Sequence, residues 1–540
     1  MRKILRRLVK RLPLSLQPKI RSYARRFPSV GWSAKPLPIV KIRPADVSQM
    51  NRDIVIEAFE NHGVSYSYLG SPRGRITQIA VLSEHKPEAL AALRSISGSH
   101  WKARLELVND HRYVDVSDLS LRPDDLRNLK YLKIYGCYED QSNQGTLRYG
   151  RELACDVQFW EQDLSRPEIR LNPQENSLPS SIHTDLLLGE PLLMGGQSIS
   201  IAPFFFNYPR LGDIAFPVDA VYLWVDGEET QWRETFNQYS KEPLANHYGG
   251  ALDERFRQIE ELRYSLRSLD MFAPWIRKVY VVTAGQRPSF LFSDDRLIFI
   301  DHSAIAHDAR CLPTFNSDAI SSWISRIDGL SEHFLYINDD MFFGRSIRPE
   351  LFFTAAGQVR TFSTGRTRPA GPISADDSLP DAKAKNLFHL VEQHFGRRPR
   401  EIVRHAPYPM SKEMMQIVER ELGEALEITR RNRFRQPNDV PIEQAVHFIS
   451  QILGLGVPST ISYGYANITT QKGLAEFARI VRRRNKDVFC LNDAPEEGSA
   501  VPPVDLIRRQ LEILFPVPSR WEIVAEDPQM PSLLLSHKLD

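Results

Sequence analysis

The second half of the chain contains four short, nearly continuous apolar runs that alternate with helical patterns. The runs are DAVYLWVDG (219–227), RKVYVVTAG (277–285), RLIFIDH (296–302) and EHFLYINDD (332–340). Strands that are apolar on both faces and alternate with helices are typical of a parallel sheet covered on both sides. We therefore predict an α/β fold for residues 216–540, with a mostly parallel, Rossmann-like sheet and a helical insertion.

Helical periodicity is clearest in residues 254–272. This segment carries an apolar face that consists of Phe256, Ile259, Leu262, Leu266 and Leu269. Further helices are predicted to begin near Asn386, Ser411, Pro441 and Val504. Residues 363–385 are rich in Gly, Pro, Ser and charge, and such composition indicates a linker or a mobile lid.

Residues 51–215 have a different texture and predict a smaller accessory region. A helix from Asn51 to Gly63 and a second one over 86–96 accompany strand patterns at 76–83 and 102–109. These form a small α/β unit. Residues 111–215 contain shorter strand-like runs broken by turn residues, so we expect a β-rich, antiparallel part there.

Residues 1–50 are predicted to form a basic amphipathic segment followed by a Pro-rich linker. Residues 1–26 hold ten Lys or Arg and no acid, which leaves 59 basic against 67 acidic residues in the rest of the chain. The basic charge thus belongs to this segment and not to a nucleic-acid-binding face. Its apolar and basic faces suit either contact with an anionic membrane or a solvated arm, and it is too short to span a bilayer.

Composition is ordinary for a globular protein, with 42% hydrophobic and 25% charged residues. The four cysteines are scattered without metal-ligand spacing, which favours a reducing compartment and argues against a structural zinc site. We expect a cytoplasmic protein, peripheral at the inner face of a bacterial plasma membrane. A phosphate-binding P-loop, a GxSxG elbow and the dinucleotide fingerprint are absent from the sequence.

Carboxylates follow two of the predicted strands, and their position is consistent with a ligand or metal site. Asp226 follows the first strand, and Asp339 and Asp340 follow the fourth. Ligands bind beyond the carboxyl ends of parallel strands, and paired carboxylates hold divalent cations that neutralise a diphosphate. The alternative is a polar turn, because Asp and Asn are good turn residues. The coincidence of two acidic strand ends favours a Mg²⁺ or Mn²⁺ site.

Four further clusters carry candidate chemistry. Arg263 and Arg267 lie at helical spacing with Glu260, which suits either phosphate binding or an exposed ion-paired face. His405 stands between prolines, and residues 430–439 are dense in Arg. The last cluster, at 489–495, again places Asn and Asp after an apolar run.

In this order, the segments make the chain resemble the Stealth family of sugar-1-phosphate transferases. The family includes bacterial capsule and exopolysaccharide phosphotransferases and is similar to the N-acetylglucosamine-1-phosphotransferase catalytic subunit. Its four conserved blocks resemble, in turn, DAVYLWVDG, the stretch 255–344, RHAPYPM (404–410) with RFRQPND (433–439), and VFCLNDA (488–494) with FPVPSRWE (515–522). The resemblance implies a nucleotide-sugar-transferase-like sheet.

Carried over residue by residue, the resemblance implies a set of site residues. The catalytic ones are Asp226, Arg263, Asn316, Asp339, Asp340, His405 and Arg435, and Asp226, Asp339 and Asp340 are the metal ligands. Substrate-binding ones are Arg267, Thr283, Gly285, Gln286, Asn492 and Asp493. The chain departs from the family at Ser321, where a Glu usually follows the Ala-Ile pair. The change implies altered acceptor handling, weaker activity or a carboxylate supplied from elsewhere, with Asp318 nearby.

The implied reaction transfers a hexose-1-phosphate from a UDP-sugar to a glycan hydroxyl and releases UMP. His405 is the candidate base for the acceptor hydroxyl, since an ordinary His titrates near working pH, and Asp340 is the alternative. Two other functions are open at this point: a metal-dependent glycosyltransferase that releases UDP, and an inactive glycan-binding homologue.

Overall fold

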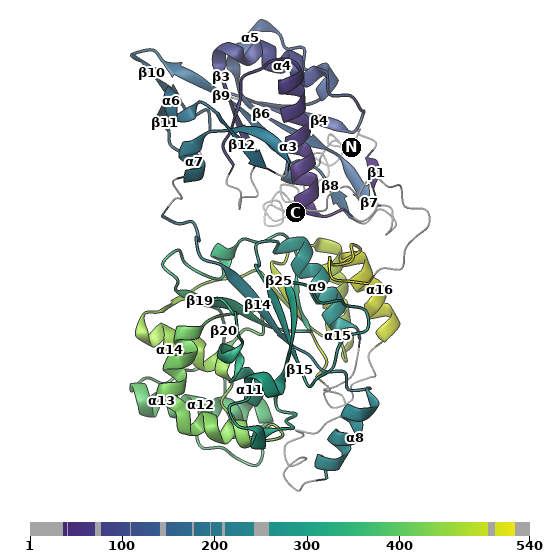
Figure 1. Ribbon diagram of the computed structural model, residues 1–540, viewed down its shortest axis with the longest axis vertical. Coiled ribbons are helices and arrows are strands. Elements are labelled where there is room, and N and C mark those ends of the chain that lie inside the picture. The colour runs from purple at the N-terminus through teal and green to yellow at the C-terminus, as the bar shows by residue number, and fades with distance from the viewer. Residues whose placement is uncertain are drawn as a thin grey trace, which may run out of the picture.

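The computed structural model describes residues 36–39, 42–70, 77–108, 110–140, 147–174, 178–194, 196–207, 211–241, 259–494 and 503–523. The basic segment 1–26 lies outside them, so its membrane contact stays a prediction. Figure 1 shows two lobes, one built from the elements up to α7 and the other from β14 onward.

A mixed ten-stranded sheet forms the N-terminal lobe. Its main order is β12-β13-β2-β3-β9-β6-β4-β5, with β10 and β11 joined at β9. The strands are β2 (Ser67–Tyr68), β3 (Thr77–Leu82), β4 (Trp101–Leu107), β5 (His111–Asp115), β6 (Leu129–Gly136), β9 (Cys155–Asp163), β10 (Arg166–Leu171), β11 (Ser181–His183), β12 (Glu190–Met194) and β13 (Gln197–Ile201). Because β3 pairs in parallel with β9, the predicted α/β unit and the β-rich part share one sheet, and that part is not purely antiparallel.

Short elements complete this lobe. They are β1 (Leu37–Ile39), β7 (Tyr138–Asp140), β8 (Arg148–Tyr149) and the helices α3 (Pro44–Asn61), α4 (Lys86–Arg94), α5 (Pro123–Asn128), α6 (Thr184–Leu187) and α7 (Pro203–Asn207). The prediction that α3 begins at Asn51 was wrong. Pro44 takes the first helical position, and the Asp46 carboxylate accepts the Arg43 N–H at 3.0 Å, so the helix starts inside the predicted linker.

The C-terminal lobe contains the predicted parallel sheet. Its order is β16-β15-β14-β17-β22, from β14 (Val218–Leu223), β15 (Val279–Thr283), β16 (Leu297–Asp301), β17 (His333–Asn338) and β22 (Tyr408–Ser411). The first four strands are parallel, and β22 is antiparallel to β17. The chain moves outward from β14 to β16 and then returns to the other side of β14. The strand order therefore reverses between β14 and β17, where Leu223 pairs with Asn338 at the carboxyl ends.

Helices and small sheets surround this central sheet (Figure 1). The helices are α8 (Thr230–Tyr239), α9 (Glu261–Phe272), α10 (His302–Ile305), α11 (Ser317–Ser321), α12 (Leu379–Phe395), α13 (Lys412–Arg431), α14 (Ile442–Leu453), α15 (Gln471–Arg483) and α16 (Val504–Leu514). The small strands are β18 (Met341–Phe343), β19 (Val359–Thr361), β20 (Ser363–Thr367), β21 (Glu401–Val403), β23 (Gly456–Pro458), β24 (Tyr463–Asn467) and β25 (Val488–Asn492).

Two boundaries differ from the sequence predictions. The segment 363–385, expected to be a linker or lid, contains β20 and the first turns of α12, since Ser378 caps α12 by accepting from the Asp381 N–H. Helix α9 begins only at Glu261, because Glu260 takes a left-handed conformation with φ of 65°. Glu260 thus does not share a helical face with Arg263 and Arg267.

A buried ion pair fastens the end of the described chain to α9. The Arg267 guanidinium donates to both carboxylate oxygens of Glu522 at 2.8 Å, and the two side chains are 8% and 2% exposed. It also donates to the Phe515 carbonyl at 3.0 Å. Arg267 is therefore occupied by protein groups and supports the packing of residues 503–523 on α9.

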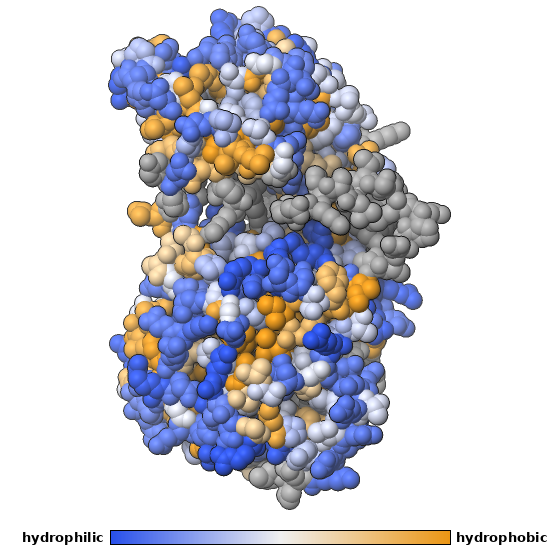
Figure 2. Space-filling model, in the orientation of Figure 1, coloured by the Kyte–Doolittle hydropathy of each residue, from blue (hydrophilic) through white to orange (hydrophobic). Residues whose placement is uncertain are grey.

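Among the described residues, no helix is long and apolar enough to cross a membrane. Figure 2 shows a largely hydrophilic face, with hydrophobic residues gathered at the lower edge of the N-terminal lobe and in a strip over the C-terminal lobe.

Arg267→Ala is expected to destabilise the protein by about 3–5 kcal/mol, because it leaves the Glu522 carboxylate buried without its partner. Thermal and urea unfolding measure the loss. Arg420→Ala serves as the control, since Arg420 is 68% exposed in a surface pair and its removal should change stability by less than about 1 kcal/mol. An Arg267→Ala protein with an unchanged melting temperature and lost activity would instead favour the predicted role in substrate binding.

Candidate functional site

A cavity of about 1460 Å³ opens at the carboxyl ends of β14 and β17. Pockets for one small molecule usually measure about 300–1,000 Å³, so this one has room for two substrates. Its lining includes six of the predicted site residues, namely Asp339, Asp340, His405, Arg435, Asn492 and Asp493. The strand-order reversal thus coincides with the cavity, as expected for an open α/β sheet.

Three carboxylates lie together on the acidic wall of this cavity. Asp339 and Asp340 follow β17, and Glu261 is the first residue of α9. Burial and the neighbouring Asp340 charge raise the pKa of Asp339 to about 7. Burial and the Asp339 charge raise the pKa of Glu261 to about 8. The cluster therefore holds more negative charge than its own surroundings neutralise.

Asp340 is also joined to a histidine and a cysteine. Its Oδ2 lies 3.4 Å from His405 Nε2 and accepts from the Cys490 thiol at 3.1 Å. Cys490 comes close because β25 pairs with β18, which places Cys490 opposite Met341. Within the described chain, no donor reaches the buried Asp340 Oδ1.

The imidazole of His405 is held from both nitrogens. Nδ1 forms a hydrogen bond with the Tyr408 hydroxyl at 2.9 Å, and Nε2 faces Asp340. Burial alone lowers the pKa of His405, but the Asp340 carboxylate more than offsets this, so the pKa is raised above the ordinary 6.5. Burial raises the pKa of Tyr408 well above 10, which keeps its hydroxyl protonated. The ring is thus oriented to exchange a proton with a group near Asp340.

Arg435 lies on a loop that Asn316 holds in place. The buried Asn316 amide donates to the Asn432 carbonyl at 3.1 Å and to Asp439 Oδ2 at 2.9 Å. Arg435 Nη2 donates to Ser317 Oγ at 2.6 Å. Asn316 is absent from the cavity lining, and its contacts are with the two ends of the loop that carries Arg435.

Two predicted residues from the segment 489–495 complete the rim of the cavity. Asn492 ends β25 and donates to the Tyr465 hydroxyl at 2.6 Å, and Asp493 follows it in the lining. The Leu491 N–H donates to the Asp340 carbonyl at 3.0 Å, which fixes this strand to the turn after β17.

Four predicted residues form a brace at the end of β14 instead of lining the cavity. The Gln286 amide accepts from the Asp226 N–H at 2.9 Å and donates to the Asp226 carbonyl at 2.8 Å. Thr283 Oγ1 donates to the Gln286 carbonyl at 2.9 Å, and Gly285 turns with φ of 82°. Asp226 Oδ1 accepts from the Glu228 N–H at 2.9 Å. This brace holds the strand end that carries Trp224 and Val225 into the cavity.

Arg263 and Arg267 also lie outside the lining. Arg263 pairs with Glu260 at 3.0 Å and Glu522 at 3.3 Å, and its guanidinium lies 4.2 Å from the Phe290 ring centroid. Together with the ion pair of Arg267, these contacts direct both arginines toward protein carboxylates.

Ser321 is buried in α11, and its Oγ donates to the Asp318 carbonyl at 3.2 Å. The Asp318 carboxylate forms an ion pair with Lys383. Asp318 is therefore a carboxylate near position 321, already engaged by a cation.

Sequence comparison finds three conserved regions of the Stealth proteins in this chain. Conserved region 2 matches residues 255–361, conserved region 3 matches 404–442, and conserved region 4 matches 478–531. An exopolysaccharide phosphotransferase of Streptomyces coelicolor is 32% identical over 497 residues, which cover 89% of this chain and 83% of the relative. The chain belongs to the Stealth family.

Other relatives carry the same description. A second Streptomyces coelicolor exopolysaccharide phosphotransferase is 31% identical and covers 89% of this chain and 91% of its own. The exopolysaccharide phosphotransferase CpsY of Mycobacterium leprae is 32% identical over 401 residues, 73% of each chain. A solved structure of the bifunctional glycosyltransferase WbbM shares 10% identity with a TM-score of 0.28 over 59% of this chain and 53% of that one, a likeness too weak to define the fold. Family membership makes this Stealth protein a phosphotransferase.

The acidic cluster of this Stealth protein fits a hard divalent cation. Asp340 Oδ1 has no protein donor among the described residues, and Asp339 adds carboxylate oxygens of the kind that Mg²⁺ and Mn²⁺ prefer. Asp226 lies outside the cavity lining, which differs from the predicted metal set. The three potential ligands that lie within 4.8 Å of one another are Asp340, His405 and Cys490, and a thiol suits softer metals. A hard cation therefore fits the Oδ1 side of Asp340 best.

Sequence reasoning missed several residues of this site. Glu261 was overlooked in favour of Glu260, and Cys490 was considered only for disulfide or zinc spacing. Tyr408 stands three residues after His405, and its aromatic character between prolines was the available signal.

Asp340→Asn is expected to raise the melting temperature at pH 8 but not at pH 5. The folded-state pKa values of Asp339 and Glu261 are raised to about 7 and 8, above the usual carboxyl value of about 4. The acidic cluster therefore lowers stability progressively as pH rises from about 4 to those values, and the loss is largely complete at pH 8. Removing one charge relieves the repulsion only where the others ionise, by on the order of 1 kcal/mol. Scanning fluorimetry in the presence of a chelator measures the effect.

The matched control is Asp328→Asn, which removes an exposed carboxylate and should leave both values unchanged. Added Mg²⁺ should raise the melting temperature of the wild type more at pH 8 than at pH 5. A lower melting temperature for Asp340→Asn at both pH values would mean that its contacts with His405 and Cys490 outweigh the repulsion, contrary to this assignment.

Proposed function

We propose that this protein acts in polysaccharide biosynthesis by transferring a hexose-1-phosphate from a UDP-sugar to a glycan hydroxyl, with release of UMP. The observation that supports this most is the convergence of Asp339, Asp340, His405 and Arg435 on one cavity at the strand-order reversal. Arg435 can bind phosphate, the two carboxylates can hold a cation, and His405 can move a proton. The cavity has room for donor and acceptor together.

In this reaction the acceptor oxygen attacks the β-phosphorus of the donor, and the bond from that phosphorus to the bridging oxygen breaks. UMP leaves with the bridging oxygen, and the new phosphodiester joins sugar and acceptor. Catalysis of phosphoryl transfer depends mainly on positioning and on positive charge around the phosphoryl oxygens. Arg435, held by Ser317 and by the Asn316-braced loop, supplies such charge at a fixed position.

The acceptor hydroxyl must also lose its proton. His405 receives it at Nε2 in this proposal, and the Asp340 carboxylate at 3.4 Å stabilises the imidazolium that results. The Tyr408 hydroxyl fixes the ring through Nδ1. The two candidate bases thus act as one pair.

Asp339 and Asp340 are the residues that would hold Mg²⁺ or Mn²⁺, which supplies charge neutralisation for the donor diphosphate. A cation held there would favour the ionised forms of these carboxyl groups.

Identification of the nucleotide product tests the proposal. A panel of UDP-sugars with a cell-derived glycan acceptor should give UMP in step with transfer. Asp340→Ala and Arg435→Ala should each lower the rate by about 100-fold or more while the protein stays folded. Arg435 supplies positive charge to the phosphoryl group, and Asp340 supports the base His405. Transfer with UDP as the product would show a glycosyltransferase, and wild-type rates in both variants would overturn the site.

The pH dependence tests the role of His405. The neutral imidazole is the base, so kcat/KM should fall as pH drops through a midpoint above 6.5, since Asp340 raises the pKa of His405. His405→Gln should lose this limb and about 100-fold to 10,000-fold in rate. His389→Gln, an exposed histidine of α12, should keep the wild-type profile. A limb that persists in His405→Gln would assign the base elsewhere.

A further inference from the structure

A row of arginines lines the cavity from the β20–β21 ribbon. These two strands pair antiparallel, with Ser363 opposite Val403 and Thr367 opposite Glu401. Successive side chains of a strand point to opposite faces. From β20 and its end the cavity lining takes the alternate positions Thr364, Arg366 and Arg368, and from β21 and its end it takes Ile402, Val403 and Arg404. The intervening β20 residues are Ser363, Gly365 and Thr367, so the positive charge of β20 and its end is concentrated on the cavity side.

Much of this positive charge is available to a ligand. Arg366 is exposed, and Arg404 lies 5.6 Å from the Tyr463 ring centroid. No carboxylate in the described ranges forms an ion pair with either of them, whereas Arg368 pairs with Asp381 at 2.8 Å. An exposed arginine can bind phosphate or carboxylate groups in a bidentate manner.

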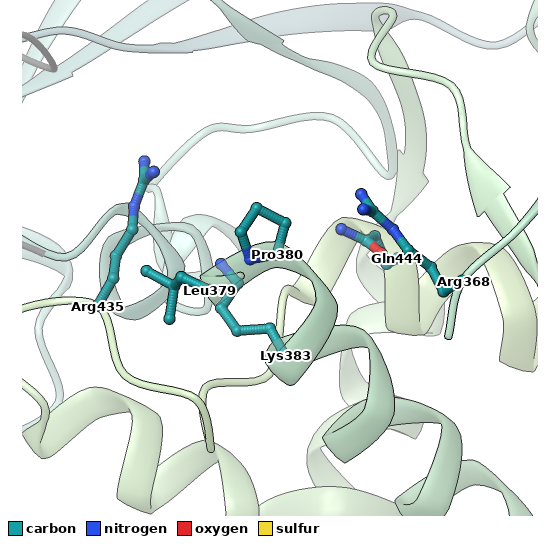
Figure 3. A pocket seen from close by; sticks show the side chains of 6 residues that line it. All are labelled: Arg368, Leu379, Pro380, Lys383, Arg435 and Gln444. Atoms are coloured by element: carbon teal, nitrogen blue, oxygen red, sulfur yellow. The ribbon is translucent and has the colours of Figure 1, made fainter. Parts of the chain in front are cut away.

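A small side pocket connects this ribbon with the catalytic arginine. It measures about 110 Å³ and is lined by Arg368, Leu379, Pro380, Lys383, Arg435 and Gln444. Figure 3 shows Arg435 and Arg368 on opposite sides of Pro380, with both guanidinium groups directed to the same open side. The positive charge therefore continues from Arg435 along Arg368 to Arg366.

This charge exceeds what the proposed donor requires. A UDP-sugar carries one diphosphate, for which Arg435 and the Asp339–Asp340 end are already assigned, and the ribbon belongs to a different element. Each transfer moreover leaves a phosphodiester on the acceptor, so an acceptor that has been extended once is anionic. The additional positive charge therefore matches the negative charge of the acceptor better than that of the donor.

We propose that the Arg366–Arg368–Arg404 row of the ribbon binds negative groups of the acceptor, and that the acceptor is therefore an anionic glycan bearing phosphodiesters or carboxylates near the attacking hydroxyl. This inference rests on the proposed transfer reaction. It specifies that the acceptor in that reaction is negatively charged. It also assigns a second binding site, for the acceptor, within the cavity.

Three fluorescently labelled oligosaccharides of equal length test the proposal: a neutral one, one with phosphodiester linkages and one with uronic acids. The wild type should show a lower KM for an anionic probe than for the neutral one, and the difference should shrink at high salt. Arg366→Gln/Arg368→Gln should reduce the KM ratio of neutral to anionic probe by about fourfold to 25-fold, at about twofold to fivefold per exposed ion pair. Anisotropy without donor measures the same loss in binding.

The matched control is Arg420→Gln/Arg431→Gln, which removes the same charge from exposed positions on α13, 68% and 70% exposed, and should keep the wild-type ratio. The single variant Arg366→Gln guards against misfolding through the lost Arg368–Asp381 pair and should still lower the ratio by about twofold to fivefold. The two anionic probes separate phosphodiester from carboxylate as the preferred group.

Equal KM values for neutral and anionic probes in the wild type, or an unchanged ratio in Arg366→Gln/Arg368→Gln, would overturn the inference while UMP-releasing transfer stands. Absence of UMP release with every donor and probe would instead overturn the proposed reaction. Anionic-probe binding that depends on Arg366 would then still support the ribbon as a glycan site.

Discussion

Repulsion among Glu261, Asp339 and Asp340 is the constraint around which the C-terminal lobe is arranged. Two of these carboxylates are consecutive and directly follow a buried strand, and the third begins helix α9, which packs against β18. Partly buried like charges are unfavourable without compensation. The lobe tolerates them where His405 and the open cavity lie alongside, so the repulsion lies at the place where a bound cation would relieve it.

Positive charge is distributed differently. The arginines of α9 are turned toward Glu522 and serve packing, whereas Arg435 and the β20–β21 ribbon face the cavity. Asn316 and the Gln286 brace lie behind the functional groups and hold the loops that carry them. The residues that line the cavity are thus distinct from those that keep strand ends and loops in position.

The four apolar strands and the placement of Asp339–Asp340 at a carboxyl end could be predicted from the sequence, because continuous burial leaves a strong pattern. The role of Arg267 could not be predicted from the sequence. An arginine on a helix shows the same sequence pattern whether it binds a phosphate or pairs with a glutamate 255 residues away. Glu261 was missed because the left-handed Glu260 interrupts a pattern that otherwise continues as helix. The ribbon was hidden in a stretch whose Gly and Pro content is typical of loops, although β20 and α12 form there.

The pairing of β25 with β18 has a consequence for how the protein is made. Asp340 emerges from the ribosome about 150 residues before Cys490, and the contact between them is part of the finished site. Until the strand that ends at Asn492 is synthesised, the turn after β17 lacks its backbone partner Leu491. A nascent chain therefore carries its acidic residues in an unassembled form until β25 has been synthesised.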